Sequence, residues 1–196
     1  MKSKIFFQKN IKLAEKGNPA ACCRVGNCYD FGTGVRKNVR EAMKWYTMAA
    51  HGGDRIGQYN YAFGLLHGEG VKKDKKASFL VMRKSARQGY SEALADLGYY
   101  YMLGIGTKAN YKKAFENYKL AAKKKVPRAH FNLGLMYMSG DGVTDSDLKA
   151  IKHFEMAVQL GHTGAYQYLA EIYLDKNSNE YNRVLGTKYK KKAYRR

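Results

Sequence analysis

Residues 129–161, AHFNLGLMYMSGDGVTDSDLKAIKHFEMAVQLG, carry the pattern that decides the fold. Ala129, Leu133 and Tyr137 follow one another at intervals of four, which places them on one face of a helix. A second helical pattern follows, and the Gly-Asp-Gly at 140–142 separates the two. Glycine permits the positive φ that ends a helix. The stretch therefore predicts two helices joined by a glycine turn, called helix A and helix B below.

The same pattern recurs every 36 residues along the chain. The first glycine of the turn recurs as Gly32, Gly68, Gly104 and Gly140. A small residue in helix A recurs as Ala21, Gly57, Ala93, Ala129 and Ala165. A Tyr or Leu in the same helix recurs as Tyr29, Leu65, Tyr101, Tyr137 and Tyr173. One helix pair cannot bury both of its faces, whereas stacked pairs share a continuous core. The sequence predicts an all-α fold, an α/α solenoid forming a right-handed superhelix of about five repeats.

We expect one repeat domain over residues 1–196. Its parts are an N-terminal capping helix at 5–17, full repeats at 20–53, 56–89, 92–125 and 128–161, and a C-terminal repeat or cap with a basic tail at 164–196.

The repeat, written A-x-x-x-L-G-x-x-Y-x-x-G-x-G-V and then K-A-x-x-W-Y-x-x-A-A-x-x-G, resembles the Sel-one-like repeat family, a relative of the tetratricopeptide repeats. The resemblance covers roughly residues 5–195, and departs at Ala62, where the family prefers Gly, and at Thr107, where Val is usual. It implies a scaffold that assembles protein complexes. One cysteine-rich branch of the family is linked to penicillin-type ligands, and this sequence lacks the paired cysteines of that branch.

The resemblance also implies where a partner binds, because A helices line the concave face in the related tetratricopeptide arrangement. The same offset predicts a partner-binding groove lined by Tyr59, Phe63, His67, Tyr99, Met102, Phe131, Leu135 and Met138. Hydrophobic side chains on a face not needed for stacking are typical of a contact surface, and Met and Tyr suit adaptable binding. The alternative is that these side chains pack against helix B of the next repeat.

Charge gives a second candidate surface. Lys and Arg number 36 against 16 Asp and Glu, a net charge of +20, and the A helices carry few of the cations. The sequence therefore predicts a basic outer ridge on B helices, turns and tail, with members Lys72, Lys73, Lys76, Lys112, Lys113, Lys124, Lys190 and Lys191. Such a ridge fits an acidic protein surface or a nucleic acid, on whose bases tail tyrosines such as Tyr189 could stack. The alternative is a solvated lysine surface.

Several function classes find no support in the sequence. No catalytic, cofactor or metal motif is present, so we expect no enzyme activity, no cofactor and no metal. Cys22, Cys23 and Cys28 lie on one predicted helix where no pair meets disulfide geometry, which indicates free thiols and a cytoplasmic location. No apolar run is long enough to span a membrane and no signal peptide is recognisable, although delivery as a secreted effector is compatible with the sequence.

The leading hypothesis is a non-enzymatic adaptor that holds a peptide or helix of a protein partner in its groove. The first alternative is a binder of nucleic acid or another polyanion. The second is a specific neutralising partner of immunity type, or a pathogen effector. A homodimer through the terminal repeats is a further hypothesis, based on the apolar residues Phe6, Phe7, Val184 and Leu185.

Overall fold

A computed structural model describes residues 2–194, which form eleven helices and no strand. The helices are α1 (Lys2–Glu15), α2 (Pro19–Phe31), α3 (Val39–His51), α4 (Arg55–His67), α5 (Lys75–Arg87), α6 (Ser91–Leu103), α7 (Tyr111–Lys123), α8 (Pro127–Ser139), α9 (Asp147–Gln159), α10 (Ala165–Leu174) and α11 (Arg183–Ala193). From α2 onward, even numbers are A helices and odd numbers are B helices. The all-α solenoid of helix–turn–helix repeats is confirmed.

Each repeat begins and ends its helices with the same devices. The B helices start after Asn38, Asp74, Asn110, Ser146 and Asn182, a column 36 residues apart whose side chains accept a hydrogen bond from a first-turn amide. This cap satisfies an amide that would otherwise lack a partner within the helix. Four A helices end at the first turn glycine, for example Gly32 at φ 72°, as the glycine columns predict.

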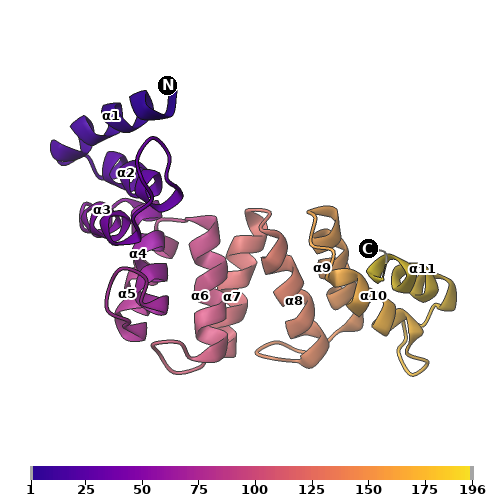
Figure 1. Ribbon diagram of the computed structural model, residues 1–196. Helices are drawn as coiled ribbons and strands as arrows, with labels where there is room; N and C mark the ends of the chain where they lie inside the picture. The colour runs from indigo at the N-terminus through magenta and orange to yellow at the C-terminus, as the bar shows by residue number, and fades with distance from the viewer. Residues whose placement is uncertain (1, 195–196) are drawn as a thin grey trace. The chain divides into compact units, whose positions relative to one another are not determined.

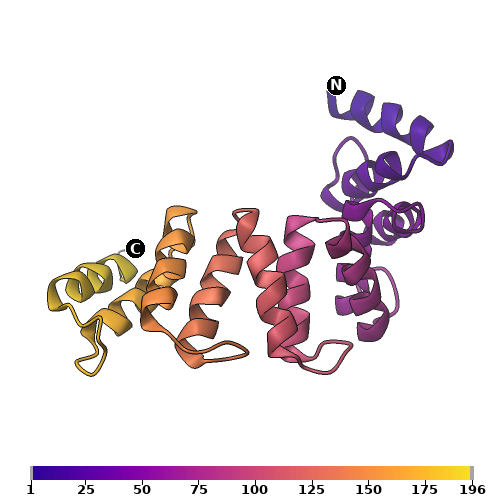
Figure 2. The ribbon, with the colours of Figure 1, turned by 180° about the vertical axis from the view of Figure 1, so that it is seen from behind.

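The chain forms two compact units, Met1–Lys108 and Ala109–Arg196, called unit 1 and unit 2. The boundary follows the A helix of the third repeat, so α1–α6 belong to unit 1 and α7–α11 to unit 2. Within each unit an A helix packs along the following B helix, as α2 with α3 and α8 with α9, and each B helix contacts the next A helix (Figures 1 and 2).

A ring seated on a glycine joins helix A to helix B inside a repeat. Tyr46 of α3 lies over Gly26 of α2, and a Cβ on that glycine would meet the ring at 2.6 Å. Phe154 of α9 lies over Gly134 of α8 with the same 2.6 Å approach. Both rings are buried, so the bare glycine backbone is what lets the two helices approach this closely. We call this contact the ring-on-glycine contact.

The second glycine of a turn stacks each repeat on the one before it. A Cβ on Gly70, at φ 68°, would lie 2.8 Å from the carbonyl oxygen of Val39 at the start of α3. A Cβ on Gly106, at φ 66°, would collide with the carbonyl of Lys75 at the start of α5. Both contacts lie within unit 1. Successive A–B turns of this unit are therefore neighbours in space, each turn lying against the first turn of the preceding B helix.

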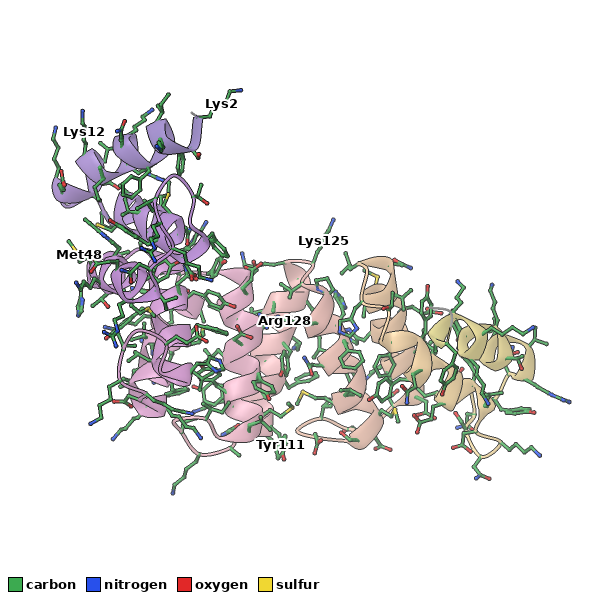
Figure 3. All side chains as sticks on the ribbon, in the orientation of Figure 1. Lys2, Lys12, Met48, Tyr111, Lys125 and Arg128 are labelled. Atoms are coloured by element: carbon green, nitrogen blue, oxygen red, sulfur yellow. The ribbon has the colours of Figure 1, made fainter. Side chains whose placement is uncertain are left out.

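One position departs from the glycine pattern. Lys125 occupies the place of Gly17, Gly53, Gly89 and Gly161 after a B helix, and it adopts φ 60°. This left-handed conformation is uncommon for a side chain that carries a Cβ. The Lys125 side chain extends away from the helices at the turn between α7 and α8 (Figure 3).

Candidate functional site

A cavity of unit 1 lies between α2, α3 and α4 and has a volume of about 210 Å³. Its walls come from one A helix, the B helix that follows and the next A helix. Its lining residues are Asp30, Val39, Ala42, Met43, Tyr46, Tyr59, Asn60, Phe63, Gly64 and Glu69. The lining is mostly apolar and contains two carboxylates and no cation. The charge of the cavity lining is therefore negative, although the net charge of the chain is +20.

Hydrogen bonds hold the polar end of this cavity in place. The buried Tyr46 hydroxyl donates to Asn27 Oδ1 at 2.7 Å and lies 3.3 Å from Asp30 Oδ2. Asn60 Nδ2 donates to the same Asn27 oxygen at 3.3 Å. Burial, together with the nearby Asp30 charge, raises the pKa of Tyr46 far above its usual range. The hydroxyl therefore stays protonated and can donate its single proton to Asn27 or to Asp30 at the polar end of the cavity.

The cavity opens beside a row of exposed apolar side chains on the A helices of unit 1. Phe63 of α4 and Tyr99 of α6 occupy the same register position and are each 44% exposed. Phe31 and Leu103 lie four residues, one helical turn, further along the same register and are 75% and 54% exposed. We call these four residues the apolar row. Isolated exposed hydrophobics are ordinary, whereas a set repeated in register on successive helices marks a contact surface.

Three further groove residues of unit 1 lie beside this row. His67 lies against Phe63 with ring centroids 4.4 Å apart. Tyr59 is half-buried, and its ring meets Tyr90 edge-on at 5.2 Å. Met102 is half-buried. The structure thus brings Tyr59, Phe63 and His67 together on one helix, with Phe63 the most accessible apolar member.

The groove residues of unit 2 lie differently. Phe131, Leu135 and Met138 of α8 are half-buried and pack against the hydrophobic core of unit 2. Phe131 stacks on His162 with centroids 4.3 Å apart and meets Tyr168 of α10 at 5.4 Å. Much of their apolar surface is therefore already covered within the unit, and the accessible apolar face is that of unit 1.

The lysines of the expected outer ridge are all exposed but lie at two different ends of the B helices. Lys72, Lys73, Lys76, Lys112 and Lys113 surround the N-terminal ends of α5 and α7. Lys124, Lys190 and Lys191 lie at the C-terminal ends of α7 and α11 instead. A B helix of thirteen residues separates its two ends by about 20 Å. The members therefore form two sets at opposite helix ends.

Tyr189 of the basic tail has an internal role. Its hydroxyl donates to Glu155 Oε1 at 3.3 Å, and its ring stacks with Tyr166 at 6.0 Å and Tyr173 at 5.8 Å. Burial, with the neighbouring Glu155 carboxylate, raises the pKa of Tyr189 to about 12. Tyr189 is therefore half-buried among residues of unit 2, whereas Tyr194, the other tyrosine of the basic tail, is 72% exposed.

The apolar residues proposed for a dimer are only partly accessible. Phe6 is 45% and Val184 79% exposed, but Phe7 packs edge-on against Tyr29 at 5.5 Å and Leu185 is half-buried. Phe7 thus contributes to the core of unit 1. The terminal surfaces retain scattered apolar side chains, with Lys2 and Lys12 extending from α1 between them (Figure 3).

A half-buried histidine pair in unit 2 makes its stability depend on pH. His130 Nδ1 and His153 Nδ1 are 3.1 Å apart. Burial lowers the pKa of His130, and burial with the nearby charges of His130 and Lys152 lowers the pKa of His153 to about 4. The unfolded chain therefore binds more protons, so the stabilisation is present above about pH 6.5 and is lost as pH falls towards 4.

We expect this loss to amount to about 1–3 kcal/mol of unfolding free energy between pH 7 and pH 4. Urea unfolding at several pH values measures it, and His153→Gln should flatten the dependence of unit 2. An identical pH profile for His153→Gln and the wild type would contradict this assignment.

The three cysteines of α2 lie inside unit 1. Cys22, Cys23 and Cys28 are free and buried, and burial, reinforced by the neighbouring Asp54, raises the pKa of the Cys23 thiol to about 12. A thiol held protonated is a poor nucleophile. Among residues 2–194, no three His, Cys, Asp or Glu side chains cluster closely enough to hold a metal ion. No helix in the same range has the length and apolarity needed to cross a bilayer.

Of the predicted groove residues, Tyr59 and Phe63 line the cavity. Tyr46 and Met43 of α3, which form its B-helix wall, were not among the residues predicted from the sequence. The available signal was the 20-residue spacing from Gly26 to Tyr46, repeated from Gly134 to Phe154. That spacing places the aromatic ring of helix B against the glycine of helix A. In the first repeat this ring, Tyr46, lines the cavity.

Comparisons with known proteins agree with this architecture. A solved Sel1 repeat protein from Oxalobacter formigenes is 29% identical, with a TM-score of 0.85, and the match covers 96% of this chain and 81% of that one. The protective antigen c5321 of uropathogenic Escherichia coli, which displays an SLR fold, is 26% identical with a TM-score of 0.89, over 95% of this chain and 40% of that one. An immunity protein from Pseudomonas aeruginosa shares the fold at 20% identity, with a TM-score of 0.56, over 95% of this chain and 72% of that one.

Among curated proteins, a sel1-like repeat-containing protein of Acanthamoeba polyphaga mimivirus is 28% identical over 87 residues, which are 44% of this chain and 16% of that protein. The chain thus matches a small part of that relative's length. The family model of the Sel1 repeat matches four consecutive segments, residues 19–54, 56–90, 91–126 and 127–162. These segments make up most of the chain and coincide with the four A–B helix pairs, and the protein therefore belongs to the Sel1 repeat family.

Proposed function

We propose that this protein is a non-enzymatic scaffold that binds a segment of a partner protein on the A-helix face of unit 1. Sel1 repeat proteins generally mediate protein–protein interactions, which supports the class of function. The observation that carries the proposal is the apolar row, with Phe63 and Tyr99 equally exposed at one register position of successive A helices. Phe63 also lines the cavity beside the row.

The dimensions of the cavity favour a single anchoring side chain. Its volume of about 210 Å³ is below the roughly 300–1,000 Å³ typical of small-molecule sites. An anchor in a pocket surrounded by exposed apolar contacts is the usual arrangement of a binding hot spot. A peptide or helix laid across α4 and α6 would cover Phe63 and Tyr99 while one of its side chains enters the cavity.

The polar groups of the cavity define the anchor further. Asp30 and Glu69 supply carboxylate acceptors, and Tyr59 and Phe63 supply aromatic walls. A Lys or Arg side chain has the apolar stem and cationic head that this lining complements. The partner segment is thus an apolar stretch with one basic anchor.

Peptides selected from a random display library against the full chain provide the test. The double substitution Phe63→Ser with Tyr99→Ser should weaken binding of the selected peptides by about tenfold or more, because hot-spot contacts each contribute upward of about 1 kcal/mol. Both side chains are 44% exposed and lie outside the buried core, so the melting temperature should change less than it would for a core substitution. Isothermal calorimetry measures the affinity.

The matched control lies on the B helices. Leu80 and Leu120 are 42% and 48% exposed, and Leu80→Ser with Leu120→Ser removes comparable apolar surface away from the A-helix face. This control should bind as the wild type does. Equal losses in both variants, or unfolding of the Phe63/Tyr99 variant, would contradict the proposed site.

A further inference from the structure

The A–B turns of unit 1 carry a cluster of cations that the scaffold function does not use. The turn of the first repeat presents Arg36, Lys37 and Arg40, and the turn of the second presents Lys72, Lys73 and Lys76. Each residue of the first triplet is 36 positions before its counterpart in the second. We call these six residues the turn stripe. All six are exposed, and none forms an ion pair with a residue that the structure describes.

The fold makes the stripe one continuous surface. Gly70 lies against the carbonyl of Val39, so the chain leaving the second turn passes beside the residue next to Arg40. The stripe thus gathers six positive charges on two touching turns. In the fourth repeat, in unit 2, the positions of Lys72, Lys73 and Lys76 are occupied by Thr144, Asp145 and Leu148, so the charge does not follow from the repeat pattern itself.

The placement of these cations opposes helix stability. Arg40 and Lys76 lie in the first turns of α3 and α5, where the carboxylates are Glu41 of α3 and the N-cap Asp74 of α5. The N-terminal end of a helix carries partial positive charge, which disfavours cations and favours anions. The backbone amides and helix dipoles at the N-terminal ends of α3 and α5 therefore add to the positive electrostatic potential of the six cationic side chains. A ligand that is itself anionic would relieve this repulsion.

From these observations we propose that the turn stripe binds the phosphate backbone of a nucleic acid without reading its sequence. A linear polymer with one charge per nucleotide matches cations spread along successive turns. A protein segment generally needs apolar anchors as well, and the apolar row lies elsewhere, on the A helices. None of the six stripe residues lines the cavity or belongs to the apolar row, so substitutions in the stripe test this proposal independently of the partner site.

Fluorescence anisotropy with a labelled oligo(dT) of about 20 nucleotides tests the proposal on the full chain. Lys72→Gln, Lys73→Gln and Lys76→Gln together should weaken binding by about tenfold or more at about 50 mM salt. They should also reduce the slope of log affinity against log salt by about 2, since each phosphate contact on a single strand contributes roughly 0.7. The control Lys188→Gln, Lys190→Gln and Lys191→Gln removes the same charge from exposed positions of α11 and should keep both affinity and slope close to those of the wild type.

A second variant separates binding from folding. Lys76→Glu places a carboxylate in the first turn of α5, so it should raise the melting temperature while weakening oligonucleotide binding. Three results would overturn the proposal: equal losses in the two triple variants, no binding by the wild type, or equally tight binding of a polyglutamate peptide of matched charge. Equally tight binding of polyglutamate would indicate that the turn stripe binds acidic proteins and not nucleic acids.

Discussion

Replacing Gly106 with alanine is expected to lower the free energy of unfolding of unit 1 by about 2–4 kcal/mol. Two costs combine at this residue. Its φ of 66° lies in the left-handed region, where a Cβ is unfavourable by about 1–2 kcal/mol. The new methyl group would also collide with the carbonyl of Lys75 and lie 2.9 Å from Phe79 Cβ. These atoms belong to the start of α5 and cannot rotate away, so the whole repeat would have to shift.

Urea denaturation followed by circular dichroism measures this loss, and Gly32→Ala is the matched control. Gly32 has φ 72° but its nearest neighbour, Lys37 Cβ, would be at 3.5 Å, an ordinary contact. The control therefore carries only the conformational cost of about 1–2 kcal/mol. Equal losses for the two alanines would show that the turn glycines are needed for φ alone and that the close stacking of turns contributes nothing.

The second large effect concerns the ring-on-glycine contact of unit 2. Phe154→Ala should lower the unfolding free energy by about 3–5 kcal/mol, since the ring is fully buried and its loss leaves a cavity. The ring also stacks with Tyr168 at a centroid distance of 5.3 Å. Denaturant unfolding of the full chain measures the change. The control Leu148→Ala, at a side chain 62% exposed on the same helix, should change stability by less than about 0.5 kcal/mol.

The same contact predicts a specific compensation. Gly134→Ala alone should destabilise unit 2, because the added methyl group would lie 2.6 Å from the Phe154 ring. Combined with Phe154→Met it should recover most of that loss, because a flexible thioether can move aside where a rigid ring cannot. Strictly additive losses in the double-mutant cycle would contradict a direct contact between the two positions.

This compensation explains one of the two departures from the repeat pattern noted in the sequence, the alanine at position 62. Ala62 stands where the other full repeats have glycine, and the residue 20 positions later is Met82 rather than an aromatic ring. Both side chains are almost completely buried. An alanine in helix A therefore coincides with a deformable partner in helix B. The departure is a paired change and leaves the packing of the second repeat intact.

The 36-residue register was sufficient to predict the helices, their order and their boundaries, because helix periodicity and turn glycines are local signals. The capping column from Asn38 to Asn182 was equally visible in the sequence, since Asn, Asp and Ser are the usual N-caps. It strengthens the register that the glycines define.

The accessible surface could not be predicted from columns alone. Phe63 and Leu135 occupy equivalent positions of the register, yet Phe63 is exposed and Leu135 packs on a core. The difference arises from neighbours in the next repeat: Tyr168 of α10 fills space beside α8 and meets Phe131. Exposure thus depends on side chains that lie far away in the sequence. The cavity has the same origin, since its polar end depends on the contact of Tyr46 with Asn27 across two helices.

The ring-on-glycine contact also has an evolutionary consequence. Repeat arrays lengthen and shorten by duplication and recombination of their units, and a crossover point is tolerated only where it separates no matched pair. A break between helix A and helix B would combine the helix A glycine of one repeat with the helix B side chain of another repeat. It could also place an alanine such as Ala62 against an aromatic ring. A break at the turn between B and the next A preserves every pair. The unit expected to be exchanged intact is therefore the A–B hairpin. Chimaeras joined at residues 53–54 or 89–90 should fold, whereas chimaeras joined inside a glycine turn between helix A and helix B should not.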